Sequence, residues 1–235
     1  DVWINDAMVT VFGRVTDVSP EEFRRVTEVT YLGTVHGTMA ALRHMRRRGA
    51  GTIVQVGSAL AYRGIPLQAA YCGAKHAIRG FTDSLRAELI AEGSRIAVTA
   101  VHLPGINTPQ FDWARSHMPR EPRPAGAVFQ PEAAAEAIVA AVRRPVREYW
   151  LGRQTLSMVL ANMVAPGLLD RRLARNAIEG QMRADAAAPG RRDNLFAPVH
   201  ALHATRGAFD REAGRAATAF PAPATRLAAA AAALG

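Results

Sequence analysis

Two residues whose side chains can exchange and tune a proton stand close together in the segment YCGAKHAIRG. Tyr71 and Lys75 are four positions apart, so on a helix the phenol and the ammonium lie on the same face. A positive charge at short range favours the phenolate and lowers the pKa of a tyrosine. We therefore interpret Tyr71 as a candidate general acid/base and Lys75 as the group that tunes it.

Lys75 is the only lysine in a chain whose other basic side chains, histidine aside, are all arginines. An ammonium is a compact charge on a flexible stem, whereas a guanidinium is a planar fork that stays protonated. A single lysine can also be an accident of an arginine-rich composition. The neighbouring Tyr71 favours a functional role over that accident.

Ser58 is the third candidate. It lies thirteen residues before Tyr71 and directly follows residues 52–57, a segment that predicts a buried strand. Open α/β sheets bind their ligands at the carboxyl ends of the strands. Ser58 is therefore expected to lie at the ligand-binding edge of such a sheet.

These residues match a known pattern. In order and separation, Ser58, Tyr71 and Lys75 resemble the Ser…Tyr-x-x-x-Lys signature of the classical short-chain dehydrogenase/reductase family. The segment VWINDA (Val2 to Ala7) resembles the strand that ends in the Asn-Asn-Ala-Gly motif of this family. The segments YLGTVHGTMAALRHMRRRGAGTIVQVGS and AVTAVHLPGINTPQF resemble its long helix with the next strand and its Pro-Gly…Thr loop. The resemblance covers roughly residues 1–155.

The resemblance implies reversible hydride transfer between NAD or NADP and a carbonyl or secondary-alcohol substrate. In that scheme Tyr71 exchanges a proton with the substrate oxygen, and Ser58 holds this oxygen by a hydrogen bond. Lys75 lowers the Tyr71 pKa and binds the nicotinamide ribose. The choice between NAD and NADP is left open. The implied cofactor contacts are Asn5, Ala7, Tyr71, Lys75, Ile106 and Thr108.

The substrate contacts are expected around one loop. Residues 108–130 occupy the position of the substrate-binding loop of the family, and Phe111 and Trp113 lie in it. Leu60 and Gln68 flank the expected pocket. All four side chains could wall an apolar substrate, or they could pack onto the core. No residue is assigned to a metal.

The sequence departs from the family pattern at several positions. Asp6 replaces the second Asn of Asn-Asn-Ala-Gly, and Met8 replaces its Gly. Thr30 stands where many members carry a catalytic Asn that holds a water in a proton relay. The segment PGINT is one residue shorter than usual, although Thr108 can still be aligned; the alternative is a loop threonine that caps the next helix.

The largest departure is the absence of a Gly-rich turn. Members of the family begin with a strand, this turn and a helix whose N-terminus receives the pyrophosphate. No G-x-x-x-G-x-G occurs here. We interpret the chain as a fragment without the first three strands and two helices, because residues 2–5 would otherwise form an exposed apolar sheet edge. Whether such a fragment is active or inactive is left open by the resemblance.

The alternation of strand and helix signals predicts an α/β fold: a three-layer, Rossmann-like parallel sheet with helices on both faces and its N-terminal strands missing. Ser19 is the expected N-cap of the first helix. We expect a partial dehydrogenase domain over residues 1–155, a helical extension over 156–182, and a disordered Ala/Arg/Pro-rich tail over 183–235. The predicted strands are 2–5, 52–57, 95–103 and 147–152, and the predicted helices 20–48, 69–92 and 130–144.

Composition limits the partners. The hydrophobic share of 49% suffices for a core, and the single Cys72 cannot form an internal disulfide. We expect a cytoplasmic protein that forms a homodimer or homotetramer through helices 20–48 and 69–92. The net charge of +9 raises nucleic acid or acidic lipid as partners. No nucleic-acid motif supports the first, whereas residues 156–180 could lie on a membrane surface or pack on their own domain.

A second function remains open from the sequence. The protein could be a relative of the dehydrogenases that binds a nucleotide without catalysis. The intact Ser58, Tyr71 and Lys75 argue against this alternative, and Asp6 and Thr30 keep it open.

Overall fold

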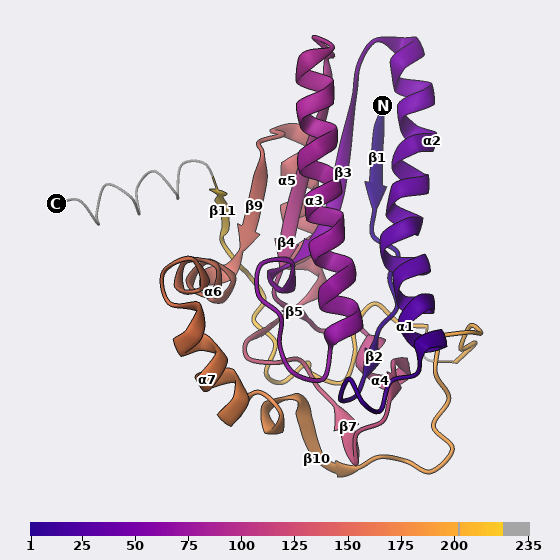
Figure 1. Ribbon diagram of the computed structural model, residues 1–235, viewed down its shortest axis with the longest axis vertical. Helices are drawn as coiled ribbons and strands as arrows, with labels where there is room; N and C mark the ends of the chain where they lie inside the picture. The colour runs from indigo at the N-terminus through magenta and orange to yellow at the C-terminus, as the bar shows by residue number, and fades with distance from the viewer. Residues whose placement is uncertain (202, 223–235) are drawn as a thin grey trace, which may run out of the picture.

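The computed structural model describes residues 1–201 and 203–222 and is built around one five-stranded sheet (Figure 1). The first four strands in spatial order are parallel, and the last is antiparallel to its neighbour. The predicted α/β fold with a mainly parallel sheet is confirmed. In spatial order the strands are β1 (Val2–Asn5), β3 (Gly51–Ser58), β4 (Ile96–Leu103), β9 (Glu148–Leu151) and β11 (Ala219–Pro221).

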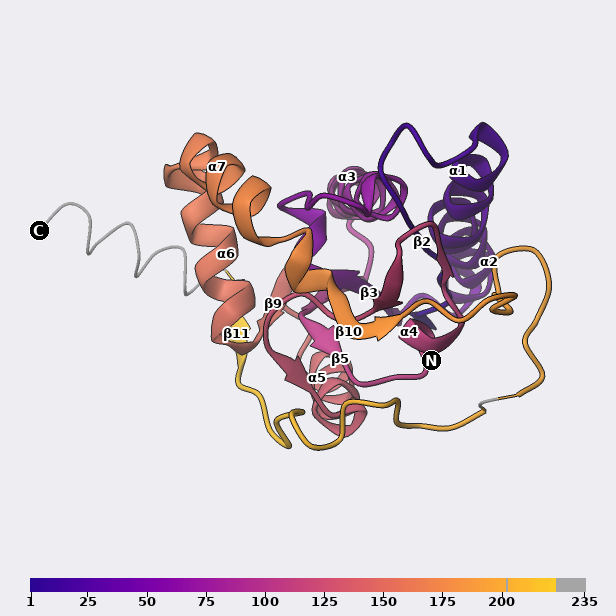
Figure 2. The same cartoon turned by 90° about the horizontal axis from the view of Figure 1, so that it is seen from below.

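Helices cover both faces of this sheet, as Figure 2 shows. The predicted helix 20–48 consists of α1 (Pro20–Val26), a π-helical turn η1 (Thr27–Leu32) and α2 (Gly33–Arg48). Together with α3 (Ala69–Ala91) it lies on one face, and α5 (Pro131–Arg143) lies on the other. The result is the three-layer arrangement expected from the alternating sequence signals.

The core divides between the two faces because successive strand residues point to opposite sides. Ile53 of β3 packs with Met45 of α2 and Leu85 of α3. The next residue, Val54, packs with Ala137 of α5 on the other side. Both strand residues are fully buried, as expected for a strand that is covered on two faces.

The first helix begins as its sequence predicts. The Ser19 hydroxyl accepts a hydrogen bond from the Glu22 amide, and the Glu22 carboxylate accepts one from the Ser19 amide. This reciprocal capping box satisfies two amides that the first turn would leave unpaired. At the other end of α2, Gly49 has a φ of 73°, the left-handed conformation that glycine adopts without strain.

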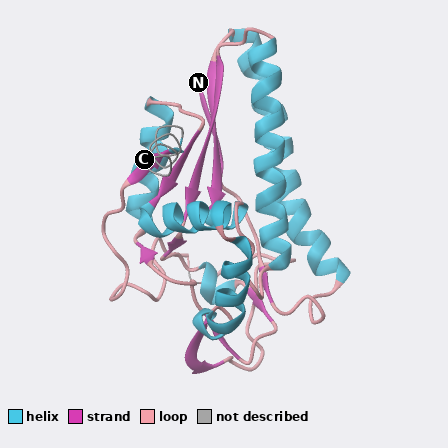
Figure 3. Ribbon diagram, turned by 60° about the vertical axis from the view of Figure 1, so that its left-hand side comes forward, coloured by secondary structure: helices cyan, strands magenta, loops and turns pink. Residues whose placement is uncertain are grey.

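The parallel strands point toward one end of the molecule, where short helices and loops cover them (Figure 3). The Pro-rich segment 109–130 is part of this cover and contains several short elements. The other parts come from the residues after β1, β3, β4 and β9. The elements are β2 (Val11–Phe12), η2 (Ala59–Ala61), β5 (Gly105–Ile106), α4 (Gln110–Trp113), β6 (Arg115–Ser116), β7 (Arg120–Pro122), β8 (Val128–Phe129), α6 (Gly152–Val164), α7 (Pro166–Asn176), η3 (Glu179–Gln181) and β10 (Met182–Ala186).

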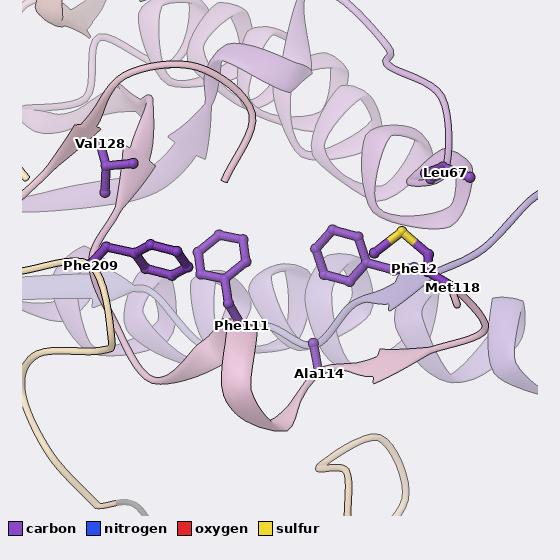
Figure 4. Close-up of a cluster of buried hydrophobic side chains, with 7 residues drawn as sticks. All are labelled: Phe12, Leu67, Phe111, Ala114, Met118, Val128 and Phe209. Atoms are coloured by element: carbon purple, nitrogen blue, oxygen red, sulfur yellow. The ribbon is translucent and has the colours of Figure 1, made fainter. Parts of the chain in front are cut away.

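A cluster of apolar side chains holds this cover together (Figure 4). Phe111 packs edge-to-face against Phe209, with the ring centroids 5.7 Å apart, and lies 6.2 Å from the Phe12 ring. Segments far apart in the sequence thereby share one core. Its buried members are Phe12, Leu67, Phe111, Ala114, Met118, Val128 and Phe209.

The segment that follows β10 differs from the expected disordered tail. Over 187–201 and 203–222 the chain runs along the domain, and Leu195 and Phe209 are buried. Asn107 fixes its course, because its amide donates to Asp210 at 2.9 Å and its oxygen accepts from the Phe209 amide at 3.0 Å. The low average hydrophobicity of this segment gave no sign that Leu195 and Phe209 would be buried. Residues 202 and 223–235 of the predicted tail lie outside the described residues.

Strand β1 forms one edge of the described sheet, and its apolar side chains Val2, Trp3 and Ile4 are exposed. Within the described ranges, no helix combines the length and the apolar character needed to span a bilayer.

Candidate active site

A cavity of about 670 Å³ lies at the carboxyl ends of β3 and β4. This is the edge at which open α/β sheets bind ligands. The residues that line it include all three candidate catalytic residues, two further candidate cofactor contacts and all four candidate substrate contacts. They are Ser58, Tyr71, Lys75, Ile106, Thr108, Leu60, Gln68, Phe111 and Trp113.

Helix α3 carries Tyr71 and Lys75 side by side. The Lys75 ammonium lies 5.6 Å from the centre of the Tyr71 ring. It donates a hydrogen bond to the Val56 carbonyl oxygen of β3 at 2.7 Å, and the side chain is buried. The four-residue spacing therefore brings the two groups together, with the ammonium held against the backbone of the sheet.

Burial dominates the electrostatics of this pair. Burial raises the pKa of the Tyr71 phenol above its usual value, and the nearby Cys72 and Asp6 raise it further, whereas the hydroxyl of Ser58 lowers it. This direction is opposite to the one predicted from the spacing of Tyr71 and Lys75. Burial also lowers the pKa of Lys75 to about 8, against a smaller rise caused by Asp6.

Ser58 is held at both its backbone and its side chain. It ends β3, where its Oγ accepts a hydrogen bond from the Leu60 amide at 3.1 Å. Its carbonyl oxygen lies 3.1 Å from Nδ1 of His102 on the adjacent strand β4. Ser58 lines the cavity together with Tyr71, whose pKa its hydroxyl lowers.

His102 belongs to a buried polar group that the sequence analysis missed. Its Nε2 lies 3.0 Å from the Glu148 carboxylate of β9, which also accepts a hydrogen bond from the Tyr62 hydroxyl. All three residues are buried, and burial together with Glu148 raises the pKa of Tyr62 to about 12. The signal in the sequence was the presence of a titratable residue in each of two consecutive predicted strands, His102 in 95–103 and Glu148 in 147–152.

The strand residue that faces His102, Gly57, leaves no room for a side chain. A Cβ on Gly57 would lie 2.5 Å from Nδ1 of His102, far inside contact distance. Gly57 therefore lets the imidazole approach the strand that carries Ser58. This requirement gives the glycine of the segment VGS a packing role.

The two predicted cofactor contacts near the N-terminus, Asn5 and Ala7, do not line the cavity, although residues beside them do. Asp6 and Met8 line the cavity, whereas Asn5 and Ala7 are not among its lining residues. The Asn5 amide instead donates to Thr38 of α2 at 3.0 Å and to Gln55 of β3 at 2.8 Å. Asn5 thus ties the edge strand to the helix and strand beside it.

Thr30, at the position of the relay asparagine, is fully buried in the π-helical turn. Its hydroxyl donates to the Val9 carbonyl at 3.0 Å and accepts from the Val9 amide at 3.1 Å. Its own carbonyl accepts a hydrogen bond from the Thr34 hydroxyl at 2.9 Å. These bonds fix the turn to the segment after β1 and engage both oxygen atoms of Thr30.

The far wall of the cavity comes from residues 155 onward, where the family resemblance was expected to end. Thr155 and Met158 of α6 and Arg172, Leu173 and Asn176 of α7 line it. Gln68 connects this wall to the catalytic side, because its amide donates to Gln181 at 2.6 Å. In the described part of the chain, no cluster of three or more His, Cys, Asp or Glu residues is arranged to hold a metal ion.

A mainly parallel sheet between helical layers, with a cavity at its strand ends, is the architecture of Rossmann-like oxidoreductases. The family model described as short chain dehydrogenase matches residues 1–118, half of the chain. The chain belongs to the short-chain dehydrogenase/reductase family.

Individual relatives agree with this assignment. An uncharacterized oxidoreductase of Bacillus subtilis, YxnA, is 36% identical over 173 residues, which are 73% of this chain and 49% of the relative. The dehydrogenase/reductase SDR family member 7B of Bos taurus is 33% identical over 185 residues, covering 75% of this chain and 55% of that protein. The chain spans about half the length of the curated relatives it matches.

Solved structures show the same fold. A short chain dehydrogenase from Burkholderia cenocepacia, solved in complex with NADP, has a TM-score of 0.61 and 25% identity, covering 73% of this chain and 68% of that one. A short-chain dehydrogenase from Streptomyces avermitilis has a TM-score of 0.59 and 22% identity, covering 76% of this chain and 71% of that one.

Proposed function

We propose that this chain carries the catalytic end of an NAD(P)-dependent oxidoreductase that interconverts a carbonyl compound and an alcohol. The observation that carries the proposal is the position of Ser58, Tyr71 and Lys75 on the wall of one cavity, with the ammonium 5.6 Å from the centre of the Tyr71 ring. Membership of the family supplies the reaction class. Ser58, Tyr71 and Lys75 supply the side chains that can transfer or hold a proton during this reaction.

The cavity offers groups that fit a nicotinamide nucleotide. Lys75 would hold the ribose hydroxyls, and Ile106 and Thr108 would contact the nicotinamide from the loop after β4. When bound, the nucleotide supplies the hydride. The Burkholderia relative was solved with NADP, which supports a nicotinamide nucleotide as the cofactor here.

The proton chemistry belongs to Tyr71. In the reducing direction its hydroxyl gives a proton to the substrate oxygen, and in the oxidising direction the phenolate takes it back. The raised pKa of the free phenol keeps the proton on Tyr71 at neutral pH. When the phenolate forms, the Lys75 ammonium stabilises its charge at short range.

Ser58 positions the substrate oxygen. Contacts with His102 and Leu60 hold its backbone carbonyl and its Oγ, so the hydroxyl oxygen has a fixed position on the cavity wall. Fixed donors aimed at developing charge need no reorganisation during the reaction. We assign Ser58 the role of donor to the substrate oxygen.

The substrate has an apolar body. Leu60, Phe111, Trp113 and Met158 contribute large apolar surfaces to the cavity. Phe111 serves two purposes, because it also packs in the cluster around Phe209. A carbonyl or secondary alcohol with a hydrophobic chain or ring fits these walls.

A nucleotide-binding protein without turnover is the second candidate function. It is favoured by Thr30, whose hydroxyl and carbonyl are both engaged inside the protein. A relay residue in this position would need an oxygen free to hold water.

The test is a screen for NADH or NADPH consumption over aldehydes and ketones, and for NAD or NADP reduction over secondary alcohols. It uses the 235-residue chain and the same chain joined at its N-terminus to the first three strands and two helices, with their Gly-rich turn, of a short-chain dehydrogenase. We expect turnover in the joined chain and its loss in Tyr71→Phe. Nucleotide binding with no Tyr71-dependent turnover on any substrate would favour the second candidate.

A further inference from the structure

The end of α6 and the outer side of α7 form an exposed patch. The apolar side chains Met163, Val164 and Leu168 are 59%, 85% and 67% exposed, and α7 contains no buried residue. Large apolar side chains grouped at such exposure are uncommon on a protein surface without a partner. We call this surface the α7 patch; its members are Met163, Val164, Leu168, Arg171, Arg172 and Arg175.

The spacing within α7 puts its members on one side. Leu168, Arg171, Arg172 and Arg175 stand at positions i, i+3, i+4 and i+7, and all four are exposed. These positions share one helix face. The opposite side carries Leu173, which is half-buried and lines the cavity. Helix α7 is therefore amphipathic, with a basic face toward solvent that Leu168 and the adjoining end of α6 make partly apolar.

The acidic residues of this region do not cancel its charge. Asp170 pairs with Arg63, and Glu179 pairs with Arg120. They are the two acidic residues of segment 163–180. In the described ranges, no ion pair is formed by Arg171, Arg172 or Arg175, so the patch presents three guanidinium groups.

We propose that the α7 patch docks on an anionic lipid surface. Arginines near such a surface are attracted by its negative potential, and apolar side chains beside them enter the boundary between headgroups and acyl chains. A nucleic acid would satisfy the arginines but would leave Val164 and Leu168 in water. A lipid surface satisfies both parts of the patch.

The location of the patch fits this role. Figure 2 shows α6 and α7 at the opposite edge of the molecule from α1 and α2. Arg172 belongs to the patch and to the lining of the cavity, so the cavity borders the docked surface. An apolar substrate could then enter from the lipid; this consequence rests on the proposed function, whereas the docking does not.

Vesicle co-sedimentation of the 235-residue chain tests the docking without any turnover. Vesicles of phosphatidylcholine alone are compared with vesicles that also contain phosphatidylserine. One variant carries Arg171→Gln, Arg172→Gln and Arg175→Gln. Its matched control removes the same charge elsewhere, by replacing the exposed Arg14, Arg43 and Arg143 with Gln.

A third variant, Val164→Ser with Leu168→Ser, removes apolar contact at constant charge. We expect the chain to bind the anionic vesicles and the α7 arginine variant to bind at least about tenfold more weakly, since each arginine contributes separately. The control should lose less than about threefold, and the serine variant should dissociate at lower salt than the parent.

Several results would overturn the proposal. Equal loss in the two arginine variants would mean adventitious attraction by net charge only. An unchanged serine variant would remove the apolar contact from the explanation. If the serine variant instead changes the oligomeric state in sedimentation velocity, the patch is an interface between copies of this chain. Circular dichroism checks that all variants fold; their substitutions lie on the surface, where such changes cost little stability.

Discussion

The Lys75 ammonium lies 5.6 Å from the centre of the Tyr71 ring, yet its hydrogen bond goes to the Val56 carbonyl oxygen at 2.7 Å. The lysine is thus anchored to the sheet while it stands close to the phenol. An anchored ammonium contributes a fixed positive charge at a defined place. This geometry explains why a chain that otherwise uses arginine has a lysine here.

Replacing Lys75 by Arg should abolish most of the activity although the charge is kept. The site is buried and the ammonium already lies at hydrogen-bond distance from the backbone, so a guanidinium has to displace its neighbours. We expect turnover in the joined chain to fall at least about a hundredfold. The measurement is the pH–rate profile, with the exposed Arg43→Lys as control. A parental profile in Lys75→Arg would make the lone lysine an accident of composition.

The depressed pKa of Lys75 also predicts how stability depends on pH. Its pKa falls from 10.5 in the unfolded chain to about 8 in the fold. Between these values the unfolded chain holds a proton that the folded chain has released, so the contribution of Lys75 to stability rises with pH. It is complete above 10.5 and is lost as the pH falls through about 8.

Comparison with Lys75→Met isolates this effect from other titrating groups. Relative to that variant, the wild type should gain up to about 3 kcal/mol of unfolding free energy between pH 7.5 and 10.5, since each pKa unit corresponds to about 1.4 kcal/mol. Denaturant unfolding across this range is the measurement. A constant difference between the two proteins would show that the buried ammonium titrates normally.

The sequence predicted the sheet, the helices and the meeting of Ser58, Tyr71 and Lys75. Those features depend on local signals: apolar runs for the strands, a capping box at Ser19, and a four-residue spacing on a helix. Parallel topology then brings strand ends together. Position along the chain thus placed Ser58 at a strand end and Tyr71 and Lys75 on one helix face, and the family resemblance implied that the three meet.

Other features depend on contacts between distant segments, which no local pattern reveals. The pairing of His102 with Glu148 joins residues 46 positions apart. Phe209 lies in a segment of low hydrophobicity and packs in the apolar cluster with Phe12 and Phe111. The direction of the Tyr71 pKa required knowing the burial around the phenol. The four-residue spacing shows that Lys75 lies near Tyr71, but it does not show how far packing removes water from the phenol.

Tyr71→Phe should remove the proton donor and keep the ring. In the joined chain we expect turnover to fall at least about a hundredfold, the usual scale for loss of a general acid/base. Nucleotide affinity should change little, because the remaining contacts of the cavity are intact. Steady-state kinetics and calorimetric titration measure the two effects separately. Near-normal turnover would remove Tyr71 from the mechanism, and a large loss of affinity would indicate a binding role instead.

The buried group around Glu148 should act as one unit in stability. Glu148→Ala leaves His102 and Tyr62 without the carboxylate that both contact, and removing one partner from a buried polar group costs about 3 kcal/mol. The exposed Glu136→Ala on α5 is the control and should change stability by less than about 0.5 kcal/mol.

A double-mutant cycle of Glu148→Gln with Tyr62→Phe tests the coupling itself. Residues joined in one buried network give interaction energies of about 0.5–3 kcal/mol. Denaturant unfolding of the four proteins yields this energy. Strictly additive effects would mean that Glu148 and Tyr62 contribute independently, and the view of a single unit behind Ser58 would be wrong.

The 235-residue chain alone should bind NADH and NADPH more weakly than micromolar. It contains no G-x-x-x-G-x-G segment to receive a pyrophosphate on a helix N-terminus. Its cavity offers Lys75, Ile106 and Thr108 for the nicotinamide end of the nucleotide only. The exposed Val2, Trp3 and Ile4 of edge strand β1 should also make this chain prone to association. Calorimetric titration with both nucleotides is the measurement, and the chain joined to a Gly-rich segment is the positive control. Micromolar binding by the chain alone would mean that another part of the molecule holds the phosphates.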